Sequence, residues 1–387
     1  MTFFIASLLQ WNGTTGVQTH VREVFPFLKQ NDSDPIFVCP HDGNLLDRII
    51  LTFMLILRKL TARFSPSFEV LLYRWGHGWI LKRRLRSFLA GADDCVIYAQ
   101  CPVSSKAARE ARFGSHQKVV LVVHFNISQA DEFVGQGRLG QNGAVYRFIQ
   151  KMESEQLPLL DGIIFVSEFM REILYKRIPS VKSVPWKVIP NFLADPKVCF
   201  ARPVGATELL CVGTLESRKN QIYALEILAA ARRLGSALSL TLIGNGPDRQ
   251  MLEAASLRLG VADDVRFLGF VANAAESFQT HRACLHVARI ENLPITLIES
   301  LSRGVPIFAP AVGGIPEVFS DGIEGRFIPL NDPDEAAQII LKWILDSQVM
   351  AMAGRAAYQR FRDKFSGESC GAMLKQFLIN QQTGALK

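Results

Sequence analysis

The chain has 387 residues, of which 49% are hydrophobic and 20% charged, and its formal net charge is +7. This length favours two or three domains with sizeable cores, and the composition excludes an intrinsically disordered chain. No run of eighteen uninterrupted apolar residues occurs, so we predict no membrane-spanning helix. The seven cysteines are scattered without C-x-x-C spacing, and we expect reduced, buried thiols and a cytoplasmic protein.

Short apolar runs alternate with helix-like segments along the chain, a pattern that is typical of parallel sheets with crossover helices. In the first half we predict strands at residues 3–9, 35–40, 94–100, 119–124, 162–167 and 186–190. In the second half we predict strands at residues 209–213, 240–244, 265–269, 283–288, 305–310 and 325–329. Because these runs are apolar almost throughout, we expect the strands to be covered on both faces.

The periodicity fails at residues 191–207, which we interpret as a linker. We therefore predict an α/β protein with two doubly wound, Rossmann-like domains at 1–190 and 208–365. Late in the chain, helices are predicted at 335–347 and 349–365. Open parallel sheets bind ligands beyond the carboxyl ends of their strands, so an interdomain cleft between two such sheets is the expected active site.

The segment from Arg48 to Lys118 carries the basic excess, with 13 Lys and Arg against 4 Asp and Glu. Large apolar residues interleave with these charges at 49–60 and 79–89. One interpretation is a pair of amphipathic helices that contact an anionic membrane surface. Another is a pair of ordinary helices that pack on their own sheet with solvated basic faces. Nucleic-acid binding would need the same charge, but no recognition motif accompanies it, so we expect no nucleic-acid partner.

Two adjacent cations, Arg218 and Lys219, follow the strand predicted at 209–213 in the motif V-G-T-L-E-S-R-K-N. A planar guanidinium and a compact ammonium together suit two phosphate groups, although a solvated basic loop is the alternative interpretation. Gly244 ends the strand predicted at 240–244, and Asn245 and Gly246 directly follow it. Glycines there would let the backbone approach a ligand closely, or simply make a tight turn. Phe270 follows the next strand, where backbone groups could pair with a nucleobase edge.

The most informative motif runs from residue 289 to 304, R-I-E-N-L-P-I-T-L-I-E-S-L-S-R-G. Pro294 suits the first position of a helix and Gly304 its end. This places Glu291 in the loop before the helix and Glu299 in its second turn.

The same helix start would leave N–H groups unpaired at the positive end of the helix dipole. These are the N–H groups of Ile295, Thr296 and Leu297. A diphosphate suits such a helix end, and flanking carboxylates can hold hydroxyl groups. The motif therefore indicates a sugar-nucleotide. The pair Glu208 and Glu216 has the same spacing without a helix start between them, so we assign it no role.

Two residues of the first domain are further candidates. Gly16, in N-G-T-T-G-V, precedes a predicted helix, again a geometry that accepts phosphate. His124 ends the run V-V-L-V-V-H and would project into the cleft, although a lone histidine is more often structural. Two D-x-D triplets, at 32–34 and 332–334, lie in polar turns, and we interpret them as solvated loops rather than metal sites.

With these residues assembled, the chain resembles the retaining glycosyltransferases of family 4, which have the GT-B fold. The resemblance covers nearly the whole chain and is strongest at 209–330. It rests on Glu291, Pro294 and Glu299, then on S-R-G-V-P-I-F-A-P-A-V-G-G-I-P-E-V at 302–318 and D-G-I-E-G-R-F-I-P at 321–329.

The resemblance implies a role for each candidate residue. The expected catalytic residues are His124, Arg218, Lys219 and Glu291, with His124 and Glu291 at the donor sugar and the cations at the phosphates. The expected donor-binding residues are Gly16, Gly213, Gly244, Asn245, Phe270, Asn292, Leu293, Thr296, Leu297 and Glu299. Of these, Glu299 would hold the ribose. Thr214 departs from the pattern, because many relatives have Arg there.

The resemblance also implies a reaction. A hexose would move from a nucleotide-sugar, with UDP-glucose favoured, to a lipid-linked or polysaccharide acceptor in cell-surface or exopolysaccharide biosynthesis. No metal would be needed, and residues 366–387 would return to the first domain. The protein would work in the cytoplasm, peripherally at the inner face of the plasma membrane. The alternatives are a UDP-sugar 2-epimerase of the same fold and a basic membrane- or nucleic-acid-binding module.

Overall fold

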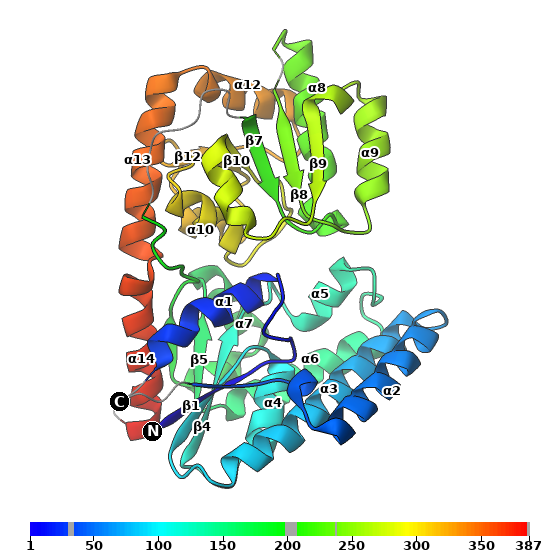
Figure 1. The fold of residues 1–387 in the computed structure, drawn as a ribbon, viewed down its shortest axis with the longest axis vertical. Helices are drawn as coiled ribbons and strands as arrows, with labels where there is room; N and C mark the ends of the chain where they lie inside the picture. Colours follow the sequence, from blue (N-terminus) through cyan, green and yellow to red (C-terminus); the bar gives the residue numbers. More distant parts are fainter. Residues whose placement is uncertain (30–34, 198–206, 237, 385–387) are drawn as a thin grey trace. The chain divides into compact units, whose positions relative to one another are not determined.

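The computed structural model describes residues 1–29, 35–197, 207–236 and 238–384, and the contacts divide the chain into two units. Unit 1 is Met1–Pro190 together with the segment that begins at Cys370, and unit 2 is Asn191–Ser369 (Figure 1). Unit 2 is thus inserted between two parts of unit 1. Of the predicted linker, residues 198–206 lie outside the described ranges, as do the first D-x-D triplet and Cys199.

In the described part of unit 1, six parallel strands form one sheet in the order β2-β1-β3-β4-β5-β6. The strands are β1 (Thr2–Ala6), β2 (Ile36–Val38), β3 (Cys95–Ala99), β4 (Gln117–Val123), β5 (Gly162–Phe165) and β6 (Trp186–Val188). Every residue of β3 and β5 is buried, so both faces of the sheet centre are covered, as the continuous apolar runs predict.

Helices cover both faces of this sheet. They are α1 (Gly16–Val24), α2 (Leu45–Ala62), α3 (Pro66–Leu89), α4 (Pro102–Ala111), α5 (Gln129–Gly135), α6 (Ala144–Gln156), α7 (Glu168–Arg177) and α14 (Gly367–Thr383). One buried cluster joins alternate strand residues to α3, α4 and α7. The last helix, α14, is fixed to unit 1 by hydrogen bonds from Gln382 Nε2 to Asp94 Oδ1 (2.9 Å) and from Lys375 Nζ to Lys29 O (2.8 Å).

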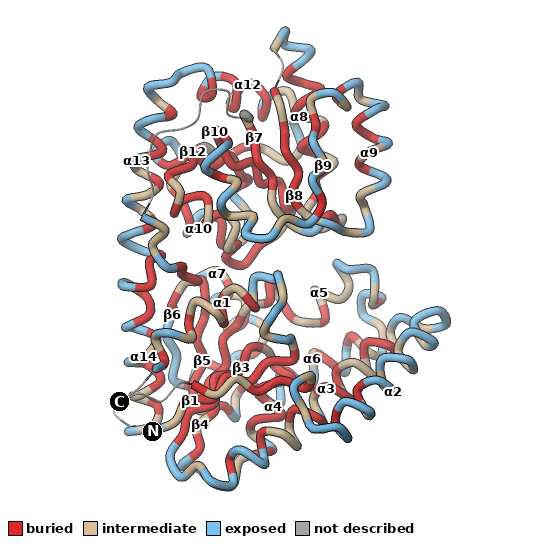
Figure 2. The backbone as a smooth tube through the Cα atoms, viewed as in Figure 1, coloured by how far each residue is buried: buried red, intermediate tan, exposed pale blue. Residues whose placement is uncertain are grey.

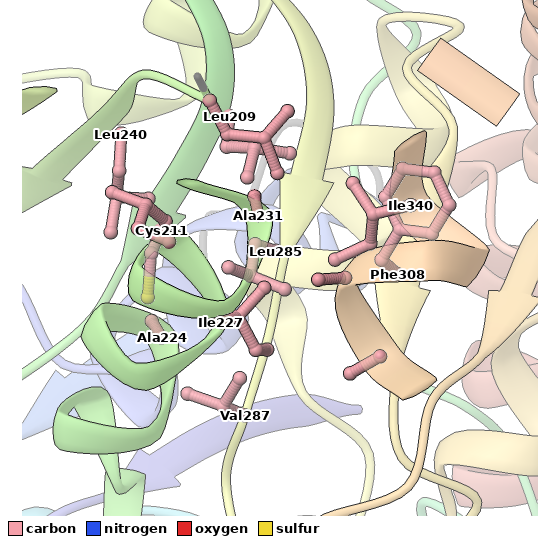
Figure 3. Close-up of a cluster of buried hydrophobic side chains, with 14 of the residues drawn as sticks. Leu209, Cys211, Ala224, Ile227, Ala231, Leu240, Leu285, Val287, Phe308 and Ile340 are labelled. Atoms are coloured by element: carbon pink, nitrogen blue, oxygen red, sulfur yellow. The ribbon is translucent and has the colours of Figure 1, made fainter. Parts of the chain in front are cut away.

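The described residues of unit 2 form a second sheet of six parallel strands, in the order β12-β11-β10-β7-β8-β9. The strands are β7 (Thr207–Val212), β8 (Leu240–Ile243), β9 (Val265–Gly269), β10 (His281–Leu285), β11 (Ile307–Ala309) and β12 (Gly325–Phe327). The helices are α8 (Gln221–Arg233), α9 (Arg249–Arg258), α10 (Ile295–Ser302), α11 (Ile315–Val318), α12 (Pro333–Ile344) and α13 (Ser347–Lys364). Figure 3 shows part of the core between this sheet and the helices α8 and α12.

The α/β class with two doubly wound units is confirmed, and each of the twelve predicted strands has a counterpart. The first strand is shorter than predicted and ends at Ala6. The backbone turns there, because the Leu9 N–H donates to Ser7 Oγ (3.0 Å) instead of to a neighbouring strand. The described cysteines carry free thiols. None of the helices in the described ranges combines the length and apolar character needed to cross a bilayer.

Candidate functional site

The carboxyl ends of β7 and β10 meet in unit 2, because these strands are neighbours in the sheet. The chain leaves β7 toward β8 on one side, whereas β10 is followed by β11 on the other side. This is the topological switch point, where open parallel sheets bind their ligands. The loop after β7 carries Arg218 and Lys219, and the loop after β10 carries Glu291, so the fold brings these candidates together across 72 residues of sequence.

Glu291 lies in a network of charges. Its Oε1 accepts a hydrogen bond from Lys219 Nζ, and its Oε2 lies 3.6 Å from a guanidinium nitrogen of Arg218. The second guanidinium nitrogen of Arg218 lies 2.8 Å from Oε1 of Glu216. Glu291 is only 6% exposed, whereas the two cations are partly exposed. The cations can therefore meet a ligand while they hold the carboxylate.

The charge state of Glu291 follows from these contacts. Burial alone would raise the pKa of this carboxyl, but Lys219, His286 and Arg218 outweigh that effect and hold its pKa well below the usual range. Glu291 is therefore a carboxylate at neutral pH, and both of its oxygens are acceptors. A carboxylate in this state suits the hydroxyl groups of a sugar and does not act as a proton donor.

Sequence reasoning missed His286, which follows β10 directly. Its Nε2 lies 3.5 Å from Oε1 of Glu291, and the residue is buried. Burial lowers the pKa of His286, so the ring that faces the carboxylate is neutral at pH 7. The available signal was a single polar side chain inside the apolar run A-C-L-H-V-A.

Hydrogen bonds join the two loops that carry the network. Asn220 Nδ2 donates to Val287 O (3.2 Å), and the Arg289 N–H donates to Arg218 O (3.2 Å). A guanidinium nitrogen of Arg289 also lies 3.2 Å from Asn220 Oδ1. Asn220 adopts the left-handed conformation (φ 58°) just before α8, which asparagine tolerates better than most residues. Asn220 was the second residue that sequence reasoning missed.

A glycine supports the backbone of Glu291 from the segment after β11. Gly313 has φ 57°, and a Cβ at this position would lie 2.0 Å from the Glu291 carbonyl oxygen. The next residue, Gly314, donates its N–H to that oxygen (2.9 Å). Only glycine allows this close approach, so the V-G-G-I-P segment holds the Glu291 loop in place.

The start of α10 differs in two details from the prediction. Pro294 is the capping residue before the helix rather than its first residue, and the Leu297 N–H donates to Pro294 O (3.1 Å). The expectation of a free N–H at Leu297 is therefore wrong, because the chain turns tightly at the proline. The N–H groups of Ile295 and Thr296 have no acceptor among the described residues. Glu299 lies in the second turn, as predicted.

Two neighbours of Glu291 were also predicted to contact the donor. Asn292 and Leu293 are both buried in the loop before α10. The Leu293 carbonyl accepts a hydrogen bond from Asn191 Nδ2 (2.9 Å), which orients this part of the loop.

The remaining candidates of unit 2 follow β7, β8 and β9 at the same edge. A Cβ on Gly244 would lie 2.0 Å from the Gly213 carbonyl oxygen, so the turns after β7 and β8 pack backbone against backbone. Asn245 is exposed, and its carbonyl accepts from the Leu215 N–H (3.0 Å). Phe270 follows β9 and is 56% exposed. These residues border the carboxyl edge without joining the charged network.

The candidates His124 and Gly16 belong to unit 1. His124 follows β4, and its Nε2 lies 3.2 Å from Gln100 Oε1, while its ring stacks edge-on with His20 (4.6 Å between centroids). His20 Nε2 in turn lies 2.9 Å from Tyr98 Oη. Burial, and then His20, hold the pKa of His124 well below its usual range, so the ring is neutral.

Gly16 begins α1, but the structure gives no reason for a glycine there. Thr15 caps the helix by accepting from the Gln18 N–H, and the Gln18 side chain accepts from the Thr15 N–H. Two of the amides near this helix start thus have partners within the chain itself.

The described residues contain no cluster of three or more His, Cys, Asp or Glu side chains that could hold a metal ion. In the triplet 332–334, Asp332 caps α12 and Asp334 pairs with Arg233 (2.8 Å).

Two Rossmann-like, doubly wound units, the second with paired charges at its switch point, define a protein of the GT-B class. Two family models match successive parts of the chain: Glycosyltransferase Family 4 at residues 14–194 and Glycosyl transferases group 1 at 200–360. The chain belongs to the family 4 glycosyltransferases.

Curated relatives match part of the chain. A GDP-mannose-dependent alpha-(1-6)-phosphatidylinositol monomannoside mannosyltransferase of Mycolicibacterium smegmatis is 28% identical over 192 residues, 47% of this chain and 49% of that protein. A glycogen synthase of Mycobacterium tuberculosis is 25% identical over 249 residues, 63% of this chain and 60% of that protein. The chain thus spans about half the length of the first of these relatives and 60% of the second.

Solved structures match over the whole chain. Sucrose-phosphate synthase of Thermosynechococcus elongatus has a TM-score of 0.75 at 16% identity, covering 100% of this chain and 99% of that one. HepE of Anabaena, solved in complex with UDP and glucose, has a TM-score of 0.68 at 16% identity with the same coverage. At this identity the similarity establishes the fold.

Proposed function

We propose that this protein is a retaining glycosyltransferase that moves a hexose from a nucleotide-sugar to a lipid-linked or polysaccharide acceptor. The observation that carries the proposal is the network of Glu291, Lys219 and Arg218 at the switch point of unit 2. An ionised carboxylate beside two cations can hold sugar hydroxyls and a diphosphate at once.

The chemistry follows from where charge develops. Cleavage of the anomeric C–O bond builds negative charge on the β-phosphate and positive character on the sugar. Lys219, Arg218 and the N–H groups of Ile295 and Thr296 stabilise that negative charge. The Lys219 ammonium has three donors, so it can bind a phosphate oxygen while it keeps its hydrogen bond to Glu291.

The other carboxylate and the histidine have separate tasks in this proposal. Glu299, in the second turn of α10, binds the ribose hydroxyls. His124, neutral and next to Gln100, contacts the donor sugar. Attack proceeds from the face of the departing phosphate, which takes the acceptor proton, so Glu291 is not a covalent nucleophile. Side-chain cations supply the positive charge that a metal would otherwise bring, so EDTA is expected to leave turnover unchanged.

The donor base and sugar are open to a direct test. The mannosyltransferase of Mycolicibacterium smegmatis is GDP-mannose-dependent, whereas HepE was solved with UDP and glucose. We favour UDP-glucose for this chain. Thermal unfolding with a panel of UDP- and GDP-sugars identifies the donor, because a bound ligand raises the unfolding temperature by mass action. A rise with GDP-mannose alone would overturn the choice of UDP.

Activity is then tested with the donor that stabilises the protein. Glu299→Ala is expected to weaken donor binding, because the ribose loses a hydroxyl acceptor. The control is Glu253→Ala, which removes a partly exposed carboxylate of α9 that pairs with Arg249. Release of sugar at the parental rate by Glu299→Ala would show that the site is wrongly assigned. Formation of a 2-epimer without transfer would identify the alternative enzyme, a UDP-sugar 2-epimerase.

A lipid-linked acceptor requires the enzyme to reach a membrane. We therefore also propose that the protein works peripherally at the inner face of the plasma membrane, with the basic segment 48–118 toward the lipid.

A further inference from the structure

Helix α2 (Leu45–Ala62) has an apolar face that nothing in the described structure covers. Its side chains are Leu45, Leu46, Ile49, Phe53, Ile56 and Leu60, here called the α2 stripe, and each exposes between 52% and 74% of its surface. At 3.6 residues per turn they fall within an arc of about 100°. Figure 2 shows the α2 tube largely exposed, in contrast to the buried strands of unit 1. A contiguous exposed apolar patch of this kind marks an interaction surface.

The packing face of α2 is a different one. Arg58 pairs with Glu69 of α3 (2.5 Å), and Asp47 lies 3.4 Å from Arg83. A Cβ on Gly76 would lie 3.4 Å from the Met54 side chain, so the two helices are in close contact there. The α2 stripe is therefore not part of the contact with α3, and α2 presents apolar side chains on its free side.

The exposed charge on α2, α3 and the turn between them is positive, and the exposed Asp42 lies just before α2. Residues 43–92 contain nine Lys and Arg but only two acidic residues, Asp47 and Glu69, and both of these are buried. Arg48, Lys59 and Arg63 are exposed, and none of them has an acidic partner among the described residues. The outer surface of the α2–α3 pair is thus apolar and positive.

Helix α3 adds aromatic side chains to the same segment. Phe68, Trp75 and Trp79 are exposed, and Phe64 between the two helices is 89% exposed. Amphipathic aromatic rings such as indole favour the level of lipid headgroups, where one edge is apolar and the other meets water.

We infer that the α2 stripe docks in the plane of an anionic bilayer. Its aliphatic and phenyl side chains enter the acyl boundary, while Arg48, Lys59 and Arg63 contact lipid phosphates. This inference deepens the proposed function, since a lipid-linked acceptor lies in such a surface, but its evidence is independent of the site in unit 2. It also assigns the lipid contact proposed for the basic segment 48–118 to one face of α2.

An anionic membrane fits this surface better than a protein partner. A second copy of the chain would bring the same positive rim against this one, and like charges oppose such a contact. A bilayer of phosphatidylglycerol supplies both the apolar layer and the negative charge.

Flotation with vesicles tests the inference. The full-length protein is expected to float with phosphatidylglycerol–phosphatidylcholine vesicles and to bind phosphatidylcholine alone much more weakly. The triple variant Ile49→Ser/Phe53→Ser/Ile56→Ser should lower the partition coefficient about a hundredfold or more, because three apolar side chains lose their burial. Arg48→Gln/Lys59→Gln/Arg63→Gln should lower it about fivefold for each cation, and only for anionic vesicles.

A matched control removes three exposed apolar side chains elsewhere. Leu257→Ser/Leu345→Ser/Met352→Ser changes unit 2 at similarly exposed positions and should leave flotation unchanged. Lys219→Ala should float with the vesicles like the parent protein. The α2 variants should hydrolyse the donor in solution at the parental rate. The two readouts therefore separate a failure of docking from a failure of the proposed function.

Hydrogen exchange of the unaltered protein gives a test without any variant. Adding anionic vesicles should slow amide exchange within residues 45–62 and leave α9 unchanged. Equal flotation of the parent and the serine variant, or no change in exchange at 45–62, would overturn the inference. A parental dimer in light scattering that the serine variant disperses would assign the α2 stripe to a second copy instead.

Discussion

The carboxyl edges of the two sheets differ in charge, although both sheets have six parallel strands in the described residues. The edge of unit 2 holds an ionised Glu291 with Lys219 and Arg218. The edge of unit 1 holds His124 and His20, which lie against Gln100 and Tyr98. The carboxyl edge of unit 2 is thus charged, whereas the carboxyl edge of unit 1 is polar and its His124 is neutral.

This difference indicates how the two units divide their work. A charged network in a buried position is stable only when its members are paired, and a diphosphate can join such a network. A neutral polar edge suits hydroxyl groups, which gain hydrogen bonds without a change in charge. We expect a diphosphate to bind at the charged edge of unit 2, whereas the edge of unit 1 suits uncharged hydroxyl groups.

The largest effect should come from removing a cation of the charged edge. Lys219→Ala is expected to lower turnover by about 10²–10³-fold, because the β-phosphate loses a stabilising charge. It also leaves Glu291 buried with a weaker partner, so the free energy of unfolding should fall by about 3 kcal/mol. Steady-state kinetics and denaturant unfolding measure the two effects. The control is Arg233→Ala, since Arg233 pairs with Asp334 on the surface; equal effects of the two variants would contradict the assignment.

A change that keeps every charge should also disturb this edge. Gly313→Ala forces a Cβ against the Glu291 carbonyl oxygen at positive φ, and we expect a loss of about 3 kcal/mol in unfolding free energy. Gly322 has φ 81° with open space around it, so Gly322→Ala carries only the backbone cost, about 1 kcal/mol. Chemical denaturation distinguishes the two. Equal losses would show that the contact with Glu291 is unimportant.

Acid should act on the buried histidines of unit 1. Burial lowers the pKa of His77 to about 4, below the value of about 6.5 in the unfolded chain. As pH falls below 6.5, the unfolded state binds a proton that the folded state rejects, so stability falls until about pH 4. The expected loss between pH 7 and pH 5 is about 2 kcal/mol from His77. His77→Phe should flatten this slope in pH-dependent unfolding, while His116→Asn, at an exposed position, should retain it.

The smallest effect should come from His286→Leu. Glu291 loses a neutral neighbour at 3.5 Å but keeps both cations, so we expect a fall in turnover of less than about tenfold. His286→Asn should recover part of the loss if the contact is polar. A loss as large as that of Lys219→Ala would instead make His286 a principal residue of the charged edge.

Much of the fold could be predicted because strands that are buried on both faces produce continuous apolar runs. The order of the strands could not, since no local pattern reports which strands are neighbours. The ends of elements also depended on single contacts, as at Ser7, whose hydroxyl turns the chain out of β1.

The site shows the same division. Glu291 could be proposed because Pro294 marks the start of a helix just after it. Arg218 and Lys219 could be proposed because two adjacent cations follow a predicted strand. The ion pair of Lys219 with Glu291 could not, because it joins residues far apart in sequence. The exposure of one face of α2 could not be predicted either. The sequence pattern of an apolar helix face is the same whether or not a neighbouring element covers that face.

The insertion of unit 2 within unit 1 has a consequence for biosynthesis. Unit 2 is one continuous segment, Asn191–Ser369, whereas unit 1 needs the part of α14 that follows Ser369. Domains generally fold as units while the ribosome elongates the chain. The continuous unit 2 can therefore acquire its native form before the residues of α14 that complete unit 1 leave the ribosome.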